Sequence, residues 1–182
     1  MGENKAFIAV EGVPIIERIH RLFQELFEEV IIVANDKHLY EKMPARIVAD
    51  LVPDRGALGG LYTGLFFSPF DYAFCVACDM PFLNGRLIEY LAGKTPGYDA
   101  VVPRTPDGLQ PLHAYYARGC IEPIRGMIEH DQYRIFDFYH AVRVLVVDPD
   151  EIRRLDPDGV SFVNINTPEE LLRIQGKAEV LQ

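Results

Sequence analysis

Short apolar runs alternate with amphipathic segments along almost the whole chain, and this alternation constrains the fold more than any other feature of the sequence. The run over residues 30–34 (VIIVA) is apolar throughout, which is typical of a strand buried on both faces. Residues 14–29, by contrast, carry isoleucine, leucine and phenylalanine at the spacing of one helical face. Strands that alternate with helices predict an α/β fold with a doubly wound, mainly parallel sheet.

The predicted elements follow one another without a linker, a repeat or a low-complexity segment, so we expect a single domain over residues 1–182. Strands are predicted over residues 7–10, 30–34, 46–49, 72–78, 100–102, 112–117 and 142–147. Helices are predicted over residues 14–29, 37–42, 58–67, 84–92 and 119–129, with Asn84 as an N-cap. Thr167 and Glu170 have the spacing of a capping box, which predicts a closing helix carrying Leu171, Leu172 and Ile174.

Composition excludes several classes of function. The formal net charge is −9, and the 18 Lys and Arg residues are scattered, which argues against a nucleic-acid partner. A small phosphorylated substrate is still compatible, because one lysine, a metal ion and backbone amides can hold a nucleotide. No apolar run approaches the ~20 residues of a membrane span. The first residues do not resemble a signal peptide, so we expect a cytoplasmic location and no membrane partner.

The 3 cysteines, Cys75, Cys78 and Cys120, cannot all pair with one another. Cys75 and Cys78 have the spacing C-x-x-C, but they lie in a predicted strand, where side chains at i and i+3 point to opposite faces. We therefore expect buried core thiols rather than a redox or zinc site.

Polar residues follow three of the predicted strands, where a doubly wound fold binds its ligands. Asn35, Asp50 and Asp79 hold these positions, and each could also be a helix cap or turn residue. Asp79 follows the most apolar strand, and its carboxylate is a hard oxygen ligand suited to Mg²⁺ bound together with substrate phosphates. Residues 56–60 (GALGG) enter a helix and could admit a ligand to the backbone or serve close helix–sheet packing. His113 has no nucleophile beside it and is interpreted as structural.

Several stretches resemble the molybdenum cofactor guanylyltransferases and related nucleotidyltransferases, in the same order. Met1-Gly2-x-x-Lys5-Ala6 is similar to the end of the family signature L-A-G-G-x-S-x-R-M-G-x-[DN]-K. The other stretches are residues 33–35 (VAN), Asp50 with residues 56–60, residues 78–82 (CDMPF), residues 110–114 (QPLHA) and residues 164–171 (NINTPEEL). They span nearly the whole chain, and their combined order is more specific than any one of them. The resemblance implies a Rossmann-like nucleotide-diphospho-sugar transferase fold.

The resemblance also implies a reaction, in which the phosphate of molybdopterin attacks the α-phosphorus of GTP and pyrophosphate leaves. Lys5 matches the lysine that neutralises nucleotide phosphates and Asp79 the metal-binding aspartate, so these are the implied catalytic residues. Because the substrate supplies the nucleophile, positioning and charge neutralisation are enough. The implied metal is Mg²⁺, at a site formed by Asp79, Asn164 and Asn166. The implied nucleotide-binding residues are Lys5, Asn35, Asp50, Gly56, Leu58, Gly60 and Asp79. Other cofactor-biosynthesis proteins and molybdoenzymes are candidate partners.

The chain departs from the signature at its start, where the L-A-G-G-x-S-x-R half has no counterpart. In the family this half forms a central strand and the phosphate-binding loop. We therefore expect exposed hydrogen-bonding edges on the two neighbouring strands and weak catalysis or none.

Two alternatives stay open. One is a cytidylyltransferase or sugar-phosphate nucleotidyltransferase on the same fold. The other is a catalytically incomplete nucleotide-binding or interaction protein, created by the missing loop.

Overall fold

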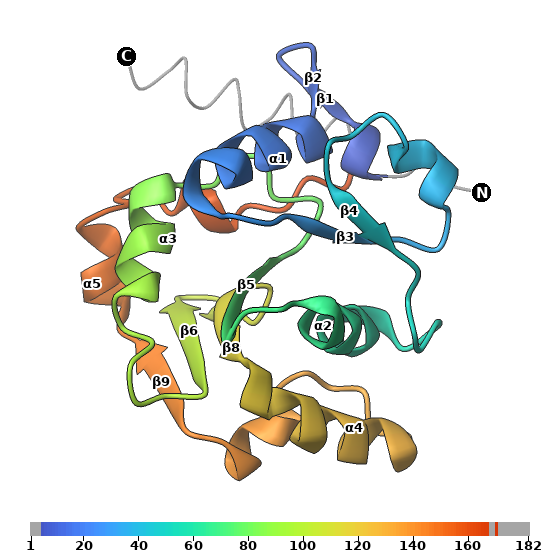
Figure 1. The fold of residues 1–182 in the computed structure, drawn as a ribbon. Coiled ribbons are helices and arrows are strands. Elements are labelled where there is room, and N and C mark those ends of the chain that lie inside the picture. Colours follow the sequence, from blue (N-terminus) through green and yellow to red (C-terminus); the bar gives the residue numbers. More distant parts are fainter. Residues whose placement is uncertain (1–4, 168–169, 171–182) are drawn as a thin grey trace.

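Two groups of strands lie next to each other in the computed structural model, which describes residues 5–167 and residue 170 (Figure 1). In the first group, β3 (Ile31–Val33) and β4 (Arg46–Val48) form a parallel pair. The second group is a sheet in the order β5 (Tyr72–Val76), β8 (His113–Ala117), β6 (Ala100–Thr105), β9 (Val144–Val147), with β7 (Gly108–Leu109) folded back onto β6. Within this sheet β8 is antiparallel to β5 and β6, whereas β9 is parallel to β6.

The helices connect these strands and cover both faces of the sheet. The α-helices are α1 (Ile15–Leu26), α2 (Gly56–Phe67), α3 (Gly85–Ala92), α4 (Ile121–Glu129) and α5 (Pro149–Arg153). Short 3₁₀ turns are η1 (Lys5–Phe7), η2 (Lys37–Tyr40), η3 (Arg118–Cys120), η4 (Asp137–Ala141) and η5 (Val160–Phe162). Asn84 caps α3 as predicted, because its side chain accepts hydrogen bonds from the main-chain N–H groups of Arg86 and Leu87.

Alternate residues of β6 and β8 belong to two separate hydrophobic cores, one on each face of the sheet. Val101 of β6 and Tyr115 of β8 pack with α1 and α3, through side chains such as Phe23. Val102 and Tyr116, on the opposite face, pack with α2 and α4. Since successive side chains of a strand point to opposite faces, this arrangement places helices on both sides of one sheet. The predicted doubly wound α/β class is confirmed.

The sheet is mixed, because β8 runs against its neighbours. Residues 106–112 return the chain directly from β6 to β8, with β7 as half of a tight hairpin. So short a connection can only join antiparallel strands, whereas a parallel neighbour needs a crossover of a dozen or more residues.

The first predicted strand does not enter this sheet. β1 (Ala9–Val10) pairs only with β2 (Val13–Pro14), as an antiparallel hairpin. Glu11 and Gly12 at its tip both have positive φ, 53° and 78°, which is the conformation of the hairpin turn whose twist suits its flanking strands.

The predicted capping box forms at the end of the described chain. The main-chain N–H of Glu170 donates to Thr167 Oγ1 at 3.2 Å, and the Glu170 carboxylate accepts from the N–H of Asn166 at 2.7 Å. Leu171, Leu172 and Ile174 of the predicted closing helix lie outside the described residues.

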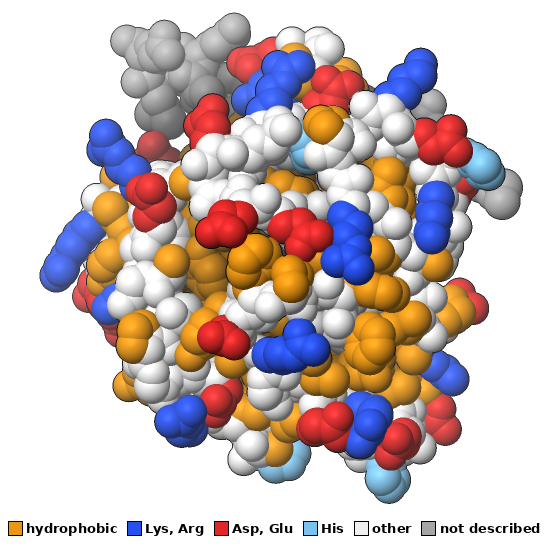
Figure 2. Space-filling model, in the orientation of Figure 1, with side chains coloured by type: hydrophobic (Ala, Val, Ile, Leu, Met, Phe, Trp, Pro, Cys, Tyr) orange, Lys and Arg blue, Asp and Glu red, His pale blue; other side chains and the backbone are white. Residues whose placement is uncertain are grey.

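The surface carries charges of both signs. Figure 2 shows Lys and Arg side chains interspersed with Asp and Glu over one face, with apolar side chains between them. Among the residues that the structure describes, no helix is long and apolar enough to cross a membrane.

Candidate active site at the carboxyl ends of the strands

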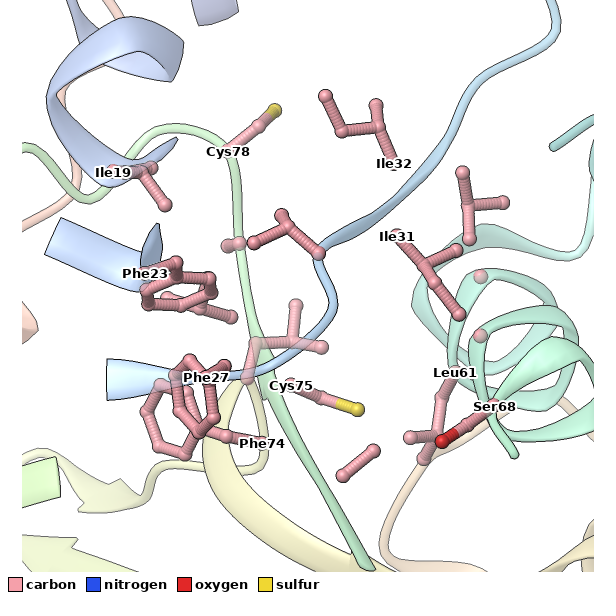
Figure 3. Close-up of a pocket in the computed structure, with 18 of the residues that line it drawn as sticks. Ile19, Phe23, Phe27, Ile31, Ile32, Leu61, Ser68, Phe74, Cys75 and Cys78 are labelled. Atoms are coloured by element: carbon pink, nitrogen blue, oxygen red, sulfur yellow. The ribbon is translucent and has the colours of Figure 1, made fainter. Parts of the chain in front are cut away.

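A cavity of about 780 Å³ separates β3 from β5 (Figure 3). We call this cavity the slot. Phe23 and Phe27 close it on one side, and Leu61 of α2 closes it on the other. The backbones of β3 and β5 form its two long walls. The slot therefore has the dimensions of a ligand pocket, but along most of its length it is lined by apolar groups.

One end of the slot is polar and holds most of the predicted site. Asp50, Gly56, Gly60 and Asp79 all contribute to its lining there. Asp50 follows β4 and Asp79 follows β5, so both lie just beyond the carboxyl ends of their strands. Doubly wound folds bind their ligands at the carboxyl ends of the strands. The predicted residues therefore lie where this fold class would place a ligand.

Asp79 is the member of this group that most resembles a metal ligand. Its Oδ1 atom is buried and has no hydrogen-bond partner among the described residues. Its main-chain carbonyl is occupied, since it accepts from the N–H of Ile165 at 2.8 Å. A buried carboxylate oxygen without a donor is costly unless a cation or a ligand donor satisfies it. The geometry therefore fits a bound divalent cation at this oxygen.

Lys5 and Asn166 meet beside Asp79, although they are 161 positions apart in the chain. Lys5 Nζ donates to Asn166 Oδ1 at 2.5 Å. Ile165 is fully buried, while Asn164 and Asn166 on either side of it are exposed. The buried Ile165 anchors the segment, and its N–H ties that segment to the strand end at Asp79.

Cys78 lies between these groups and is exposed, so the prediction of a buried thiol was wrong for this residue. The strand ends at Val76 and not at Cys78, which releases the side chain from the core. Partial desolvation and the neighbouring Asp79 raise the pKa of the Cys78 thiol, while Lys5 lowers it. Both charges are therefore within electrostatic reach of the same sulfur atom. Cys75 is half-buried, Cys120 is buried, and burial raises the pKa of each thiol to about 12.

Asp50 is held in a turn by a residue that the sequence did not single out. Its Oδ1 accepts from the N–H of Val52 at 3.1 Å and from the hydroxyl of the buried Thr63 at 2.8 Å. Thr63 Oγ1 in turn accepts from the N–H of Leu51 at 3.0 Å. A lone threonine in the otherwise apolar helix at residues 56–67 was the available signal, since a buried hydroxyl needs a partner.

The glycines that open α2 have different roles. Gly56 has φ of +57°, a conformation that glycine adopts without strain. A Cβ atom on Gly60 would meet nothing within 4 Å, so this position leaves open space at the polar end of the slot. No side chain caps α2, and the N–H groups of its first turn remain suited to an anion.

Gly59, in contrast, serves close packing, because a Cβ there would lie 2.8 Å from the main-chain oxygen of Val52. We expect Gly59→Ala to lower the free energy of unfolding by about 1–3 kcal/mol, since the overlap is with a main-chain oxygen that no side-chain rotation can move away. Gly126→Ala in α4 is the matched control, because its Cβ would meet nothing within 4 Å and the helix would gain roughly 0.5–1 kcal/mol. Urea unfolding of both variants measures the difference, and equal values for the two would contradict this packing role.

The remaining predicted residues lie around this site and not at its centre. Asn35 is exposed beyond β3 and is not part of the slot lining. Leu58 is fully buried in the core formed with α4, so only its main chain could face a nucleotide. His113 is fully buried, which agrees with a structural role.

The donor set suits a hard cation. Among the described residues no three His, Cys, Asp or Glu side chains come together as a metal cluster. A cation at Asp79 would therefore have one carboxylate from the protein, with amide oxygens, water or substrate phosphates as its other ligands. This is the coordination that Mg²⁺ commonly adopts with nucleotides.

Known proteins resemble this chain over nearly its whole length. Residues 1–144 match the family model described as MobA-like NTP transferase domain. The chain is 36% identical over 179 residues to a probable molybdenum cofactor guanylyltransferase of Pelotomaculum thermopropionicum, covering 98% of this chain and 87% of that protein. It is 38% identical over 171 residues to the molybdenum cofactor guanylyltransferase of Desulfosudis oleivorans, covering 93% and 85%. The crystal structure of the molybdopterin-guanine dinucleotide biosynthesis protein A of Archaeoglobus fulgidus matches with a TM-score of 0.83 and 27% identity, covering 98% and 92%.

These matches extend over nearly the whole chain and include every stretch of the resemblance found in the sequence. The shared fold also explains why the polar residues gather at one edge of the strands. The chain therefore belongs to the MobA-like NTP transferase family, a family of nucleotidyltransferase enzymes.

Proposed function

We propose that this protein transfers GMP from GTP to molybdopterin and releases pyrophosphate. The observation that carries the proposal is the unpartnered buried oxygen of Asp79 beside the Lys5–Asn166 pair. Relatives that share more than a third of the sequence are named molybdenum cofactor guanylyltransferases, which favours guanine over the other nucleotides.

Different residues of the site position the nucleotide and neutralise the charge of its phosphates. The Lys5 ammonium is held at the site edge by Asn166 and is placed to neutralise the triphosphate. The first turn of α2 offers N–H groups to a phosphate, and Gly60 leaves room for the base or ribose. Asp50 is already bonded to Thr63 and Val52, so its role is to fix the loop before α2 and to offer its remaining oxygen to the nucleotide.

Mg²⁺ is the proposed metal, with Asp79 as its carboxylate ligand and Asn164 and Asn166 on the segment that lies across it. When bound, such an ion neutralises charge that develops on the transferred phosphoryl group. Asp79 holds its oxygen in a buried, preorganised position, and the Ile165 N–H fixes the main chain that carries it. Molybdopterin brings the attacking phosphate, so no protein nucleophile is needed.

Nucleotide-dependent thermal stability tests the proposal directly. We expect GTP with Mg²⁺ to raise Tm, with CTP and ATP giving smaller shifts and GTP without Mg²⁺ giving little, because a ligand stabilises in proportion to its affinity for the folded state. A larger shift with CTP or ATP would reassign the substrate. If no nucleotide shifts Tm, the result would favour the alternative of a catalytically incomplete protein.

The proposed partners follow from this function. GTP and molybdopterin are the proposed substrates, and other cofactor-biosynthesis proteins or molybdoenzymes are the proposed protein partners. The cytoplasmic location expected from the sequence stays a prediction.

A further inference from the structure

Three side chains join two surface loops next to the start of α2. Arg55 is the residue before α2, and Asp131 and Tyr133 lie in the loop that follows α4. The guanidinium carbon of Arg55 lies 4.5 Å from the centre of the Tyr133 ring, and Arg55 Nη2 lies 3.6 Å from Asp131 Oδ1. The Tyr133 hydroxyl donates to the same carboxylate oxygen. We call these three side chains the clamp.

The loop after α4 gives the clamp a fixed support. The main-chain N–H of Asp131 donates to the carbonyl of Ile128 at 3.2 Å. The N–H of Gln132 donates to the carbonyl of Met127 at 3.0 Å. α4 itself packs against α2 in one hydrophobic core (Figure 1). On this side the clamp is therefore attached to a helix that the core holds in place.

The loop before α2 has a backbone conformation that its surroundings must maintain. Asp54 has φ of 65° and Gly56 has φ of 57°, so the chain is left-handed on both sides of Arg55. Asp131, the acceptor across the clamp, is also left-handed, with φ of 56°. This conformation is disfavoured for residues other than glycine and persists where nearby contacts hold it. The clamp supplies such contacts to both loops.

The clamp acts on the end of the loop that leads into α2. The other end, at Asp50, is already fixed by hydrogen bonds to Thr63 and Val52. The carbonyl of Arg55 accepts from the N–H of Gly59 at 3.4 Å, a bond within the first turn of the helix. A movement of Arg55 would therefore tilt the N–H groups of this turn.

The clamp lies outside the slot and on the surface. None of its three side chains lines the slot, whereas Gly56 and Gly60 of the adjoining helix do. The side chains of Arg55 and Asp131 are 42% and 81% exposed. Exposed ion pairs contribute little to the stability of a fold. The effect expected of the clamp is therefore on the orientation of the turn that faces the ligand.

We propose that Tyr133 is a positioning residue for the nucleotide and acts through Arg55. The clamp fixes the loop before α2, so that the N–H groups of the first turn are already oriented when the triphosphate arrives. The role rests on the proposed function, since it requires a nucleotide at the polar end of the slot. A loss of orientation weakens ground-state and transition-state binding equally, which raises KM and leaves kcat unchanged.

The test compares two variants of Tyr133 with a matched control in α3. Tyr133→Ala removes the ring, whereas Tyr133→Phe keeps the ring against the guanidinium and loses only the hydroxyl. The control is Tyr90→Ala, because Tyr90, Lys94 and Glu151 form a second set of ring, cation and carboxylate that does not line the slot. Lys94 Nζ lies 4.7 Å from the centre of the Tyr90 ring and 2.6 Å from Glu151 Oε2, and the Tyr90 hydroxyl donates to that oxygen.

We expect Tyr133→Ala to raise the KM for GTP about fivefold, the effect of one exposed cation–π contact, with kcat nearly unchanged. Tyr133→Phe and Tyr90→Ala should leave both constants as in the parent. Arg55→Ala should raise KM as much as Tyr133→Ala, and the double variant should raise it no further, because both changes remove the same contact. Unchanged KM in Tyr133→Ala, or an equal rise in Tyr90→Ala, would overturn the proposal.

Amide exchange provides a readout without nucleotide. We expect the N–H of Gly59 to exchange about fivefold faster in Tyr133→Ala, because the first turn of α2 opens more often. The N–H of Leu51, which donates to Thr63 Oγ1 at the fixed end of the loop, should exchange as in the parent. Equal exchange at Gly59 in Tyr133→Ala and the parent would also overturn the proposal, since the clamp would then not hold the turn.

Nucleotide binding by the parent separates this role from the proposed function. If the parent turns over GTP and Tyr133→Ala has the same KM, the role of the clamp falls and the function stands. If the parent binds CTP or ATP in place of GTP and Tyr133→Ala weakens that binding about fivefold, the clamp stands and guanylyl transfer falls. A parent that binds no nucleotide overturns both.

Discussion

Replacing Asp79 with asparagine is expected to remove the Mg²⁺-dependent part of nucleotide binding and to lower the rate of GMP transfer by about 10²–10³-fold, the cost of losing one preorganised electrostatic contact. The amide keeps the shape of the side chain but loses the charge that attracts the cation. The measurements are the Tm shift with GTP and Mg²⁺ and the rate of pyrophosphate release. Asp71→Asn, at the opposite end of β5, is the matched control and should leave both unchanged.

Stability without metal provides a readout that a structural aspartate would not give. Because Asp79 Oδ1 is buried without a donor, the carboxylate destabilises the ligand-free fold. Asp79→Asn should therefore raise Tm slightly in the presence of a chelator, while it abolishes the response to Mg²⁺. A lower Tm in chelator, or a retained response to limiting Mg²⁺, would contradict the assignment of Asp79 as a metal ligand.

The second large effect is expected from His113, a residue with no part in the proposed chemistry. Its ring lies between Phe74 and Phe162, it is fully buried, and neither nitrogen has a hydrogen-bond partner of normal geometry among the described residues. Burial lowers the pKa of His113 to about 3, against a smaller opposing effect of the Ser161 main chain. The unfolded chain binds a proton near pH 6.5 and the folded chain does not, so stability falls as pH drops from about 6.5 toward 3. The full loss is roughly 5 kcal/mol, because each tenfold difference in proton affinity between the folded and unfolded chains corresponds to about 1.4 kcal/mol.

His113→Leu should remove this acid sensitivity. The variant should be at least as stable as the parent at pH 7.5, because two unsatisfied nitrogens leave the core, and its advantage should grow as the pH is lowered to 5. Urea unfolding at a series of pH values measures the difference, with His130→Gln, an exposed histidine, as the control. A constant difference between His113→Leu and the parent across this range would show that proton binding at His113 does not limit acid stability.

The helices and most strands could be predicted because their apolar residues repeat with the period of the element. The strand at residues 30–34 and the helix capped by Asn84 are examples in which local sequence and burial agree. The direction of β8 was not predictable in this way, because parallel and antiparallel strands have the same period. It follows from the short return from β6, a property of connection length.

The site was predictable to the extent that its residues follow strands. Asp50 and Asp79 were found by position alone, and the structure places both at the polar end of the slot. Thr63 was missed because its partner, Asp50, is 13 positions away and no periodicity connects them. The exposure of Cys78 was missed because an apolar run does not reveal the residue at which a strand ends.

The bond between Lys5 and Asn166 has a consequence for the order of events during synthesis. Its partners are 161 positions apart, so nearly the entire polypeptide must leave the ribosome before they can meet. Contacts this distant in sequence are the slowest to form. The local hairpin of β1 and β2 and the early helices can form sooner, because their contacts are close in sequence. A nascent chain can therefore hold much of its secondary structure while its site for the triphosphate is still incomplete. If Lys5 and Asn166 hold the triphosphate as proposed, a complete nucleotide site forms only after this contact has closed.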